Sequence, residues 1–198
     1  MKTNWIICLL GGMWLASCSP DDPAPNEDVN ALYQQFHGKY KAVSSVSSEA
    51  IDVNLDGLAS TDMLAEIPDL TLQNSNYLEL RIYGPGKLRE GNAFILTQWW
   101  PEQDIRTKAN KLWNGEPIDY DPHLSVYYAM QGSPRYFSFS TDLMQILVRP
   151  SENENPFRWQ RPESVTVEGA GRMRVVNKRR LYTRAGVKEV TITTVYVR

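Results

Sequence analysis

The chain has 198 residues, with 21 basic and 23 acidic side chains and a formal net charge of −2. The apolar share of 42% and the aromatic share of 11% indicate a folded globular protein and exclude a largely disordered chain. The charge is uneven, because residues 18–70 hold ten acids and two lysines while residues 149–198 hold eleven bases and five acids. These C-terminal bases alternate along predicted strands and no nucleic-acid-binding module accompanies them, so we expect no nucleic-acid partner.

The first 17 residues have the layout of an export signal. Lys2 precedes an apolar run at residues 5–16, which is shorter than the roughly 20 residues that a membrane-spanning helix needs. Residues 15–18 read Leu-Ala-Ser-Cys and resemble the lipobox of bacterial lipoproteins. The resemblance implies a signal peptide at residues 1–17 and attachment to the lipid bilayer through a lipidated Cys18. The alternative is an ordinary secretory peptide with an incidental cysteine.

The residues after Cys18 predict a tether followed by one domain. Residues 18–28 contain three prolines and four acids, which favours an extended, solvated segment. Residues 29–198 are enough for a single folded domain without a disulfide, since Cys8 belongs to the predicted signal peptide. Ser19 after the cysteine, and the acidic stretch that follows, resemble sorting signals of Gram-negative lipoproteins. They imply an outer-membrane lipoprotein, at the cell surface or on the periplasmic face.

Period-two alternation dominates the domain and predicts a mostly β fold. One short helix is expected at residues 28–36, with Asp28 as its N-cap, and a second at residues 60–67, with Ser60 or Thr61 as its cap. Hairpin turns are expected at residues 132–134 and 184–186. The predicted strands cover residues 39–47, 77–83, 93–100, 124–131, 135–141, 144–149, 164–168, 173–182 and 187–197. This pattern favours an antiparallel eight-stranded barrel, with a β-sandwich as the alternative.

The segment from Asp52 to Glu66 contains the pattern Asp-x-Asn-x-Asp-Gly. Oxygen-bearing side chains at alternate positions, followed by glycine, can wrap Ca²⁺. The candidate ligands are Asp52, Asn54, Asp56, the carbonyl of Leu58, and Asp62 or Glu66 as the closing carboxylate. An EF-hand would place its closing Glu at position 63, where this chain has methionine. The alternative is an Asp/Asn-rich turn whose side chains bond their own backbone.

Two further segments complete a family resemblance. Residues 38–43 read Gly-Lys-Tyr-Lys-Ala-Val, and the chain ends Tyr-Val-Arg. With the Asp-x-Asn-x-Asp-Gly segment, they resemble the lipocalin-like lipoproteins of Bacteroidota, in which glycine usually stands at the position of Leu55. The resemblance implies an eight-stranded calycin-like barrel. It implies fold more than function, because most members of this family have no assigned activity.

Candidate binding residues are aromatic rather than catalytic. The two histidines, His37 and His123, lie far apart, and there is no phosphate-binding loop or dinucleotide fingerprint, so we expect no enzyme activity. Trp99, Trp100 and Tyr128 are candidates for stacking on a sugar or lining an apolar cavity. Since neighbouring strand residues face opposite sides, only one of the two tryptophans is expected to face the core.

Two non-catalytic functions follow from these features. The first is a membrane-anchored envelope lipoprotein whose barrel binds a small apolar molecule or a glycan. The second is a structural or accessory lipoprotein that docks on another envelope protein, with the calcium loop bracing the fold. A large apolar cavity would favour the first, whereas a filled barrel with an exposed apolar patch would favour the second.

Overall fold

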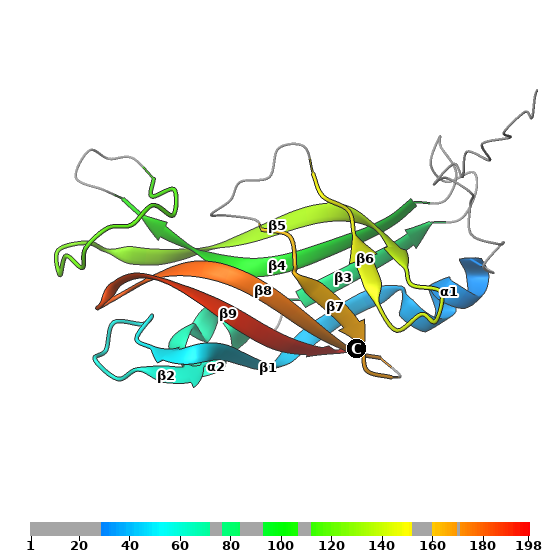
Figure 1. Cartoon of the computed structure of the whole chain (residues 1–198), viewed down its shortest axis with the longest axis horizontal. Coiled ribbons are helices and arrows are strands. Elements are labelled where there is room, and N and C mark those ends of the chain that lie inside the picture. Colours follow the sequence, from blue (N-terminus) through cyan, green and yellow to red (C-terminus); the bar gives the residue numbers. More distant parts are fainter. Residues whose placement is uncertain (1–28, 72–76, 84–92, 107–111, 152–159, 170) are drawn as a thin grey trace, which may run out of the picture.

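The computed structural model describes residues 29–71, 77–83, 93–106, 112–151, 160–169 and 171–198 (Figure 1). The predicted signal peptide, Cys18 and the tether to residue 28 lie outside these residues, as does the proposed cap Asp28. Within the described part of the chain, no helix has the length and apolar character needed to span a membrane.

The described residues are mostly β-strand. Three short helices are present: α1 (Val29–Phe36), α2 (Met63–Glu66) and the 3-10 helix η1 (Pro68–Thr71). The strands are β1 (Gly38–Ile51), β2 (Ser60–Asp62), β3 (Tyr77–Tyr83), β4 (Ala93–Ile105), β5 (Val126–Phe139), β6 (Ile146–Val148), β7 (Ser164–Val167), β8 (Arg172–Thr183) and β9 (Gly186–Val197).

Eight of these strands form a nearly closed antiparallel barrel, which confirms the predicted fold class. The hydrogen-bonded order is β6-β5-β4-β3-β1-β9-β8-β7, and β2 pairs with β1 outside this path. Because β1 and β9 are neighbours, the strands follow one another around the barrel in chain order, which is the up-and-down arrangement of lipocalins. The barrel closes between β6 and β7 through one bridge, Gln145 to Thr166, and a backbone bond from Val167 to Met144 of 2.8 Å.

The closure is incomplete along most of the seam. Beyond the bridge, β6 and β7 diverge around a cavity of about 290 Å³. β6 pairs only with residues 137–139 of β5, and β7 pairs only with residues 173–176 of β8. The remaining lengths of β5 and β8 therefore have one strand neighbour each among the described residues.

Helix α1 covers one end of the barrel, next to the C-terminus (Figure 1). Its buried residues Leu32 and Phe36 join an apolar cluster with inward side chains of the barrel strands, such as Leu80 and Phe139. Leu32 and Phe36 are four residues apart and so share one helix face. The Tyr40 hydroxyl donates to the Phe36 carbonyl at 2.7 Å and fixes the turn from α1 into β1.

Two predicted elements were wrong, and the strands predicted at residues 39–47 and 93–100 extend further, to Ile51 and Ile105. The expected hairpin at residues 132–134 is the middle of β5, which pairs with β4 without interruption from Tyr136 to Val126. Pro134 is tolerated because this part of β5 has no strand partner, among the described residues, on the side away from β4. Proline lacks the backbone N–H that such a partner would need for a hydrogen bond. The expected helix at residues 60–67 is strand β2 followed by α2, and Asp62, not Ser60 or Thr61, caps the helix by accepting from the Leu64 amide.

The other predicted hairpin is confirmed. Thr183 pairs with Gly186, which leaves Arg184 and Ala185 as a two-residue turn between β8 and β9. Gly186 has φ of +83°, a conformation that glycine adopts without steric cost. The turn projects Arg184 toward the loop at residues 52–57.

Gly132 makes the uninterrupted β4–β5 pairing possible because the Trp99 ring lies over it. Trp99 pairs with Gly132, and a Cβ at Gly132 would come within 2.9 Å of the indole ring. The Gly132→Ala substitution should therefore destabilise the fold by about 1–3 kcal/mol, as overpacking does. Urea unfolding measures this loss, and adding Trp99→Leu should restore most of it. Equal losses in the single and double variants would contradict this account.

Candidate functional site

The Asp52–Glu66 segment folds as a turn in which carboxylates accept backbone hydrogen bonds. The Asp52 carboxylate accepts from the Gly57 amide at 2.9 Å, and that of Asp56 accepts from the Leu58 amide at 2.7 Å. Asn54 bonds Asp56 through both its side-chain oxygen and its side-chain nitrogen. The side-chain bonds therefore match the Asp/Asn-rich turn that was the alternative to calcium.

The proposed closing carboxylates bond elsewhere in the same segment. The buried carboxylate of Glu66 accepts from the amides of Val53, at 2.8 Å, and Asn54, at 3.3 Å. Asp62 accepts from the Leu64 amide as the α2 cap. No group of three or more His, Cys, Asp or Glu side chains suited to a metal is found in the described part of the chain. Calcium binding stays a prediction. It would require these carboxylates to exchange their present hydrogen bonds for bonds to the metal ion.

Arg184 supplies the positive charge of this loop in the structure. Its guanidinium donates two hydrogen bonds to the Leu55 carbonyl, at 2.7 and 3.0 Å, and lies 3.5 Å from the Asp52 carboxylate. Leu55 has φ of +64°, the left-handed conformation in which glycine would stand without strain. The Leu55 side chain packs against the cluster of Ile105, Trp113 and Tyr182, which offsets that strain.

The three aromatic candidates do not share a surface. Trp100 faces inward and is 1% exposed, whereas Trp99 lies on the other face of β4, beside Tyr77. Tyr128 packs against the apolar cluster that contains Trp100, and its hydroxyl donates to the Val53 carbonyl at 3.3 Å. As expected for adjacent strand residues, the two tryptophans point to opposite sides. They therefore do not form one binding platform with Tyr128.

Polar side chains link β4 and β8 across the middle of the barrel. Gln98 and Asn177 exchange two hydrogen bonds of 3.0 and 3.1 Å. The side-chain oxygen of Gln103 accepts from the Tyr182 backbone N–H at 2.7 Å, and the side-chain nitrogen of Gln103 donates to the Tyr182 carbonyl at 2.9 Å. Gln103 thus bonds the unpaired side of β8 as a neighbouring strand would. These links bring the opposite walls of the barrel together.

A buried ion pair continues the same polar layer. Arg179 of β8 donates to Glu102 of β4 at 3.0 Å, and its guanidinium lies 4.1 Å from the centre of the Trp100 ring. Burial lowers the pKa of Arg179, while the Glu102 carboxylate opposes that shift. The cavity beside these side chains measures only about 10 Å³, which is room for about one water molecule. These side chains therefore leave little free space between β4 and β8 in this part of the interior.

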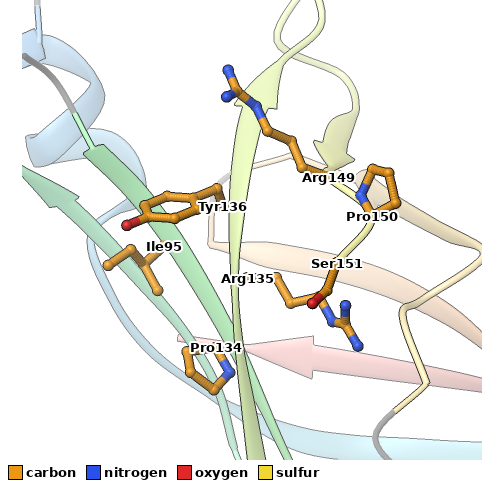
Figure 2. Close-up of a pocket in the computed structure, with 7 residues that line it drawn as sticks. All are labelled: Ile95, Pro134, Arg135, Tyr136, Arg149, Pro150 and Ser151. Atoms are coloured by element: carbon orange, nitrogen blue, oxygen red, sulfur yellow. The ribbon is translucent and has the colours of Figure 1, made fainter. Parts of the chain in front are cut away.

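The more spacious site is a cleft of about 390 Å³ in the barrel wall, at the edge of β5 (Figure 2). Tyr136 and Ile95 lie on one side of the β5 strand, and Pro150 and Ser151 lie on the other. The Tyr136 side chain is 60% exposed. The cleft is lined by Ile95, Pro134, Arg135, Tyr136, Arg149, Pro150 and Ser151.

Strand pairing explains how these residues meet. Ile95 and Tyr136 are direct partners on β4 and β5 and so share the outer face of the sheet. The Arg149 amide donates to the Tyr136 carbonyl at 2.8 Å, which extends the β5–β6 ladder and holds residues 149–151 beside the cleft. Arg135 alternates with Tyr136, is 8% exposed, and lines both this cleft and the interior cavity.

The predicted strand at residues 135–141 already implies that Tyr136 faces outward, since Phe137 and Phe139 alternate with it as core residues. Sequence reasoning missed the cleft because it could not show which residues lie beside Tyr136. The meeting of Ile95 with Tyr136 depends on the β4–β5 register, which no local pattern specifies. The aromatic signal was present, but it pointed to the tryptophans.

No family model matches the sequence, and no similar curated protein or solved structure was found.

Arg184 offers a test of the loop description. Arg184→Ala removes both hydrogen bonds to the Leu55 carbonyl and should lower the free energy of unfolding by about 1 kcal/mol. Urea unfolding measures the change. Arg174→Ala, which removes an exposed arginine from the face of β8, is the matched control and should cost less. Equal losses in the two variants would contradict a specific role for Arg184.

The calcium prediction has a separate test. If the loop binds Ca²⁺, millimolar Ca²⁺ should raise the melting temperature above that in EDTA, because a ligand that binds only the folded state stabilises it. Asp56→Ala should abolish the rise. Identical melting curves with Ca²⁺ and with EDTA would show that the loop is an Arg184-bonded turn only.

Burial raises the pKa of the Tyr128 hydroxyl to about 12. Since an unfolded tyrosine titrates near 10, the neutral hydroxyl contributes stability below pH about 10, and this contribution is lost as pH rises toward about 12. Tyr128→Phe should therefore flatten the fall in melting temperature across this window. Burial also raises the pKa values of Tyr40 and Tyr196, so part of the fall remains. A profile identical to that of the exposed control Tyr127→Phe would contradict the assignment.

Proposed function

We propose that this protein is a cell-envelope lipoprotein whose non-catalytic barrel domain binds a glycan in the cleft beside Tyr136. The cleft carries the proposal: it combines an exposed aromatic ring, apolar neighbours and polar groups in a volume of about 390 Å³, within the range of small-molecule sites. An aromatic face packs against the C–H face of a sugar ring, while its hydroxyl remains able to hydrogen-bond.

The small space between β4 and β8 favours a glycan over a small apolar molecule. An apolar ligand needs an enclosed apolar cavity of several hundred Å³, and the cavity beside the β4–β8 contacts measures about 10 Å³. The cleft is open and carries charged and hydroxyl groups at its rim, which suits a ligand that stays largely hydrated. Membrane anchoring through a lipidated Cys18 would present the cleft on the cell envelope, and this anchor remains part of the proposal.

Docking on another envelope protein is the second candidate function. The exposed side chains of Met144 and Leu147 favour it, because Leu147 lies on the same outer face of β5 and β6 as Tyr136. Exposed apolar groups gathered on one face are typical of protein-binding surfaces. Leu147→Glu should weaken such docking and leave glycan binding unchanged.

A glycan array with neutral and acidic oligosaccharides tests the proposed function. The wild-type protein should bind a subset of the array, and Tyr136→Ala should reduce that binding at least tenfold, because the stacking surface is lost. Tyr127→Ala is the matched control, since Tyr127 is also exposed on β5 but does not line the cleft. Absence of binding by the wild-type protein, or equal losses in both variants, would refute glycan binding in this cleft.

A further inference from the structure

The charged side chains of the Tyr136 cleft are of one sign. Two of its seven lining residues, Arg135 and Arg149, are cationic, and none is acidic. A neutral ligand would gain little from this arrangement, whereas an anionic ligand is attracted to it.

Arg149 differs from the arginines on the face of β8. Arg172 and Arg174 both pair with Glu168, and Arg180 pairs with Glu189. Arg149 has no ion pair with any residue that the structure describes, and its side chain is exposed. Its backbone is nevertheless held, because its amide donates to the Tyr136 carbonyl at 2.8 Å. The backbone of Arg149 is thus held against the backbone of Tyr136, while its charged side chain stays exposed.

These two groups match complementary parts of one ligand. The planar guanidinium binds a carboxylate or sulfate through two parallel hydrogen bonds. The Tyr136 ring offers a flat surface to a sugar ring. Figure 2 shows the Tyr136 ring on one side of the β5 ribbon, beside Ile95, and the Arg149 side chain extending from the segment that follows β6; both residues line the cleft.

We propose that the ligand is an acidic glycan, whose carboxylate or sulfate binds Arg149 while a sugar ring stacks on Tyr136. This inference rests on the proposed glycan-binding function. Because part of the binding free energy is electrostatic, affinity should fall as salt screens the charge.

The experiment compares two oligosaccharides that differ only in charge. Trigalacturonic acid and its neutral methyl ester are titrated into the full-length protein in detergent by calorimetry. The acid should bind at least tenfold more tightly than the ester, and raising the salt from 50 to 300 mM should weaken the acid alone. Arg149→Gln should remove most of this preference. Arg174→Gln, which removes the same charge outside the cleft, should preserve it.

The outcomes separate this inference from the function on which it rests. Equal affinity for acid and ester, or an array response confined to neutral glycans, would overturn the acidic ligand and leave glycan binding intact. Binding of other acidic glycans on the array, with loss in Arg149→Gln, would support the acidic class even if galacturonate itself is a poor ligand. No response to any glycan would overturn both.

Discussion

The polar contacts between β4 and β8 determine what the inside of this barrel can hold. Gln98 bonds Asn177, Glu102 pairs with Arg179, and Gln103 bonds the Tyr182 backbone. Up-and-down barrels can keep their opposite walls apart and enclose a ligand, but here hydrogen bonds join the walls. A buried polar network is stable only when its members are satisfied, so the separation of β4 and β8 is closely constrained. The Arg179–Glu102 pair adds geometric specificity more than net stability.

Two larger spaces border the wall of the barrel, one beside β5 and one between β6 and β7. β5 and β8 extend past their short partners β6 and β7, and Gln103 bonds the side of β8 that has no strand neighbour. The edge of β5 at residues 134–136 instead borders the cleft that residues 149–151 complete. The same incomplete closure that brings polar groups into the barrel therefore creates an outer site with an exposed ring and a cation.

The loop at residues 52–57 illustrates how one motif supports two structures. Alternating oxygen side chains followed by glycine can surround a cation, and they can also accept the amides of their own turn. In this chain the amides occupy the carboxylates, and Arg184 from the β8–β9 turn binds the Leu55 carbonyl. The Arg184 guanidinium is already part of the folded chain. A Ca²⁺ ion would have to displace these contacts in order to bind.

The local sequence was sufficient for the fold class and for several of the elements. The alternation at Tyr77–Tyr83 gave a strand with the predicted bounds, and the turn at residues 184–186 formed as its residue types require. Alternation also predicted that Trp99 and Trp100 would face opposite sides. These features depend on backbone preferences and on a period of two, both of which are properties of neighbouring residues. The break wrongly placed at Gly132-Ser133-Pro134 shows the limit, because a turn-like triplet stays extended when pairing along β4 and the Trp99 ring stabilise it.

The interior and the candidate site were decided by tertiary structure. No local signal shows that Gln98 meets Asn177, 79 positions away, or that Ile95 faces Tyr136. Register and barrel closure set those meetings, and they depend on the combined packing of all strands. The sequence by itself therefore determined a mostly β domain and the turn at residues 184–186. Only the folded chain decided that polar side chains join β4 to β8 and that a cleft lies beside Tyr136, because contacts between distant strands depend on the whole structure.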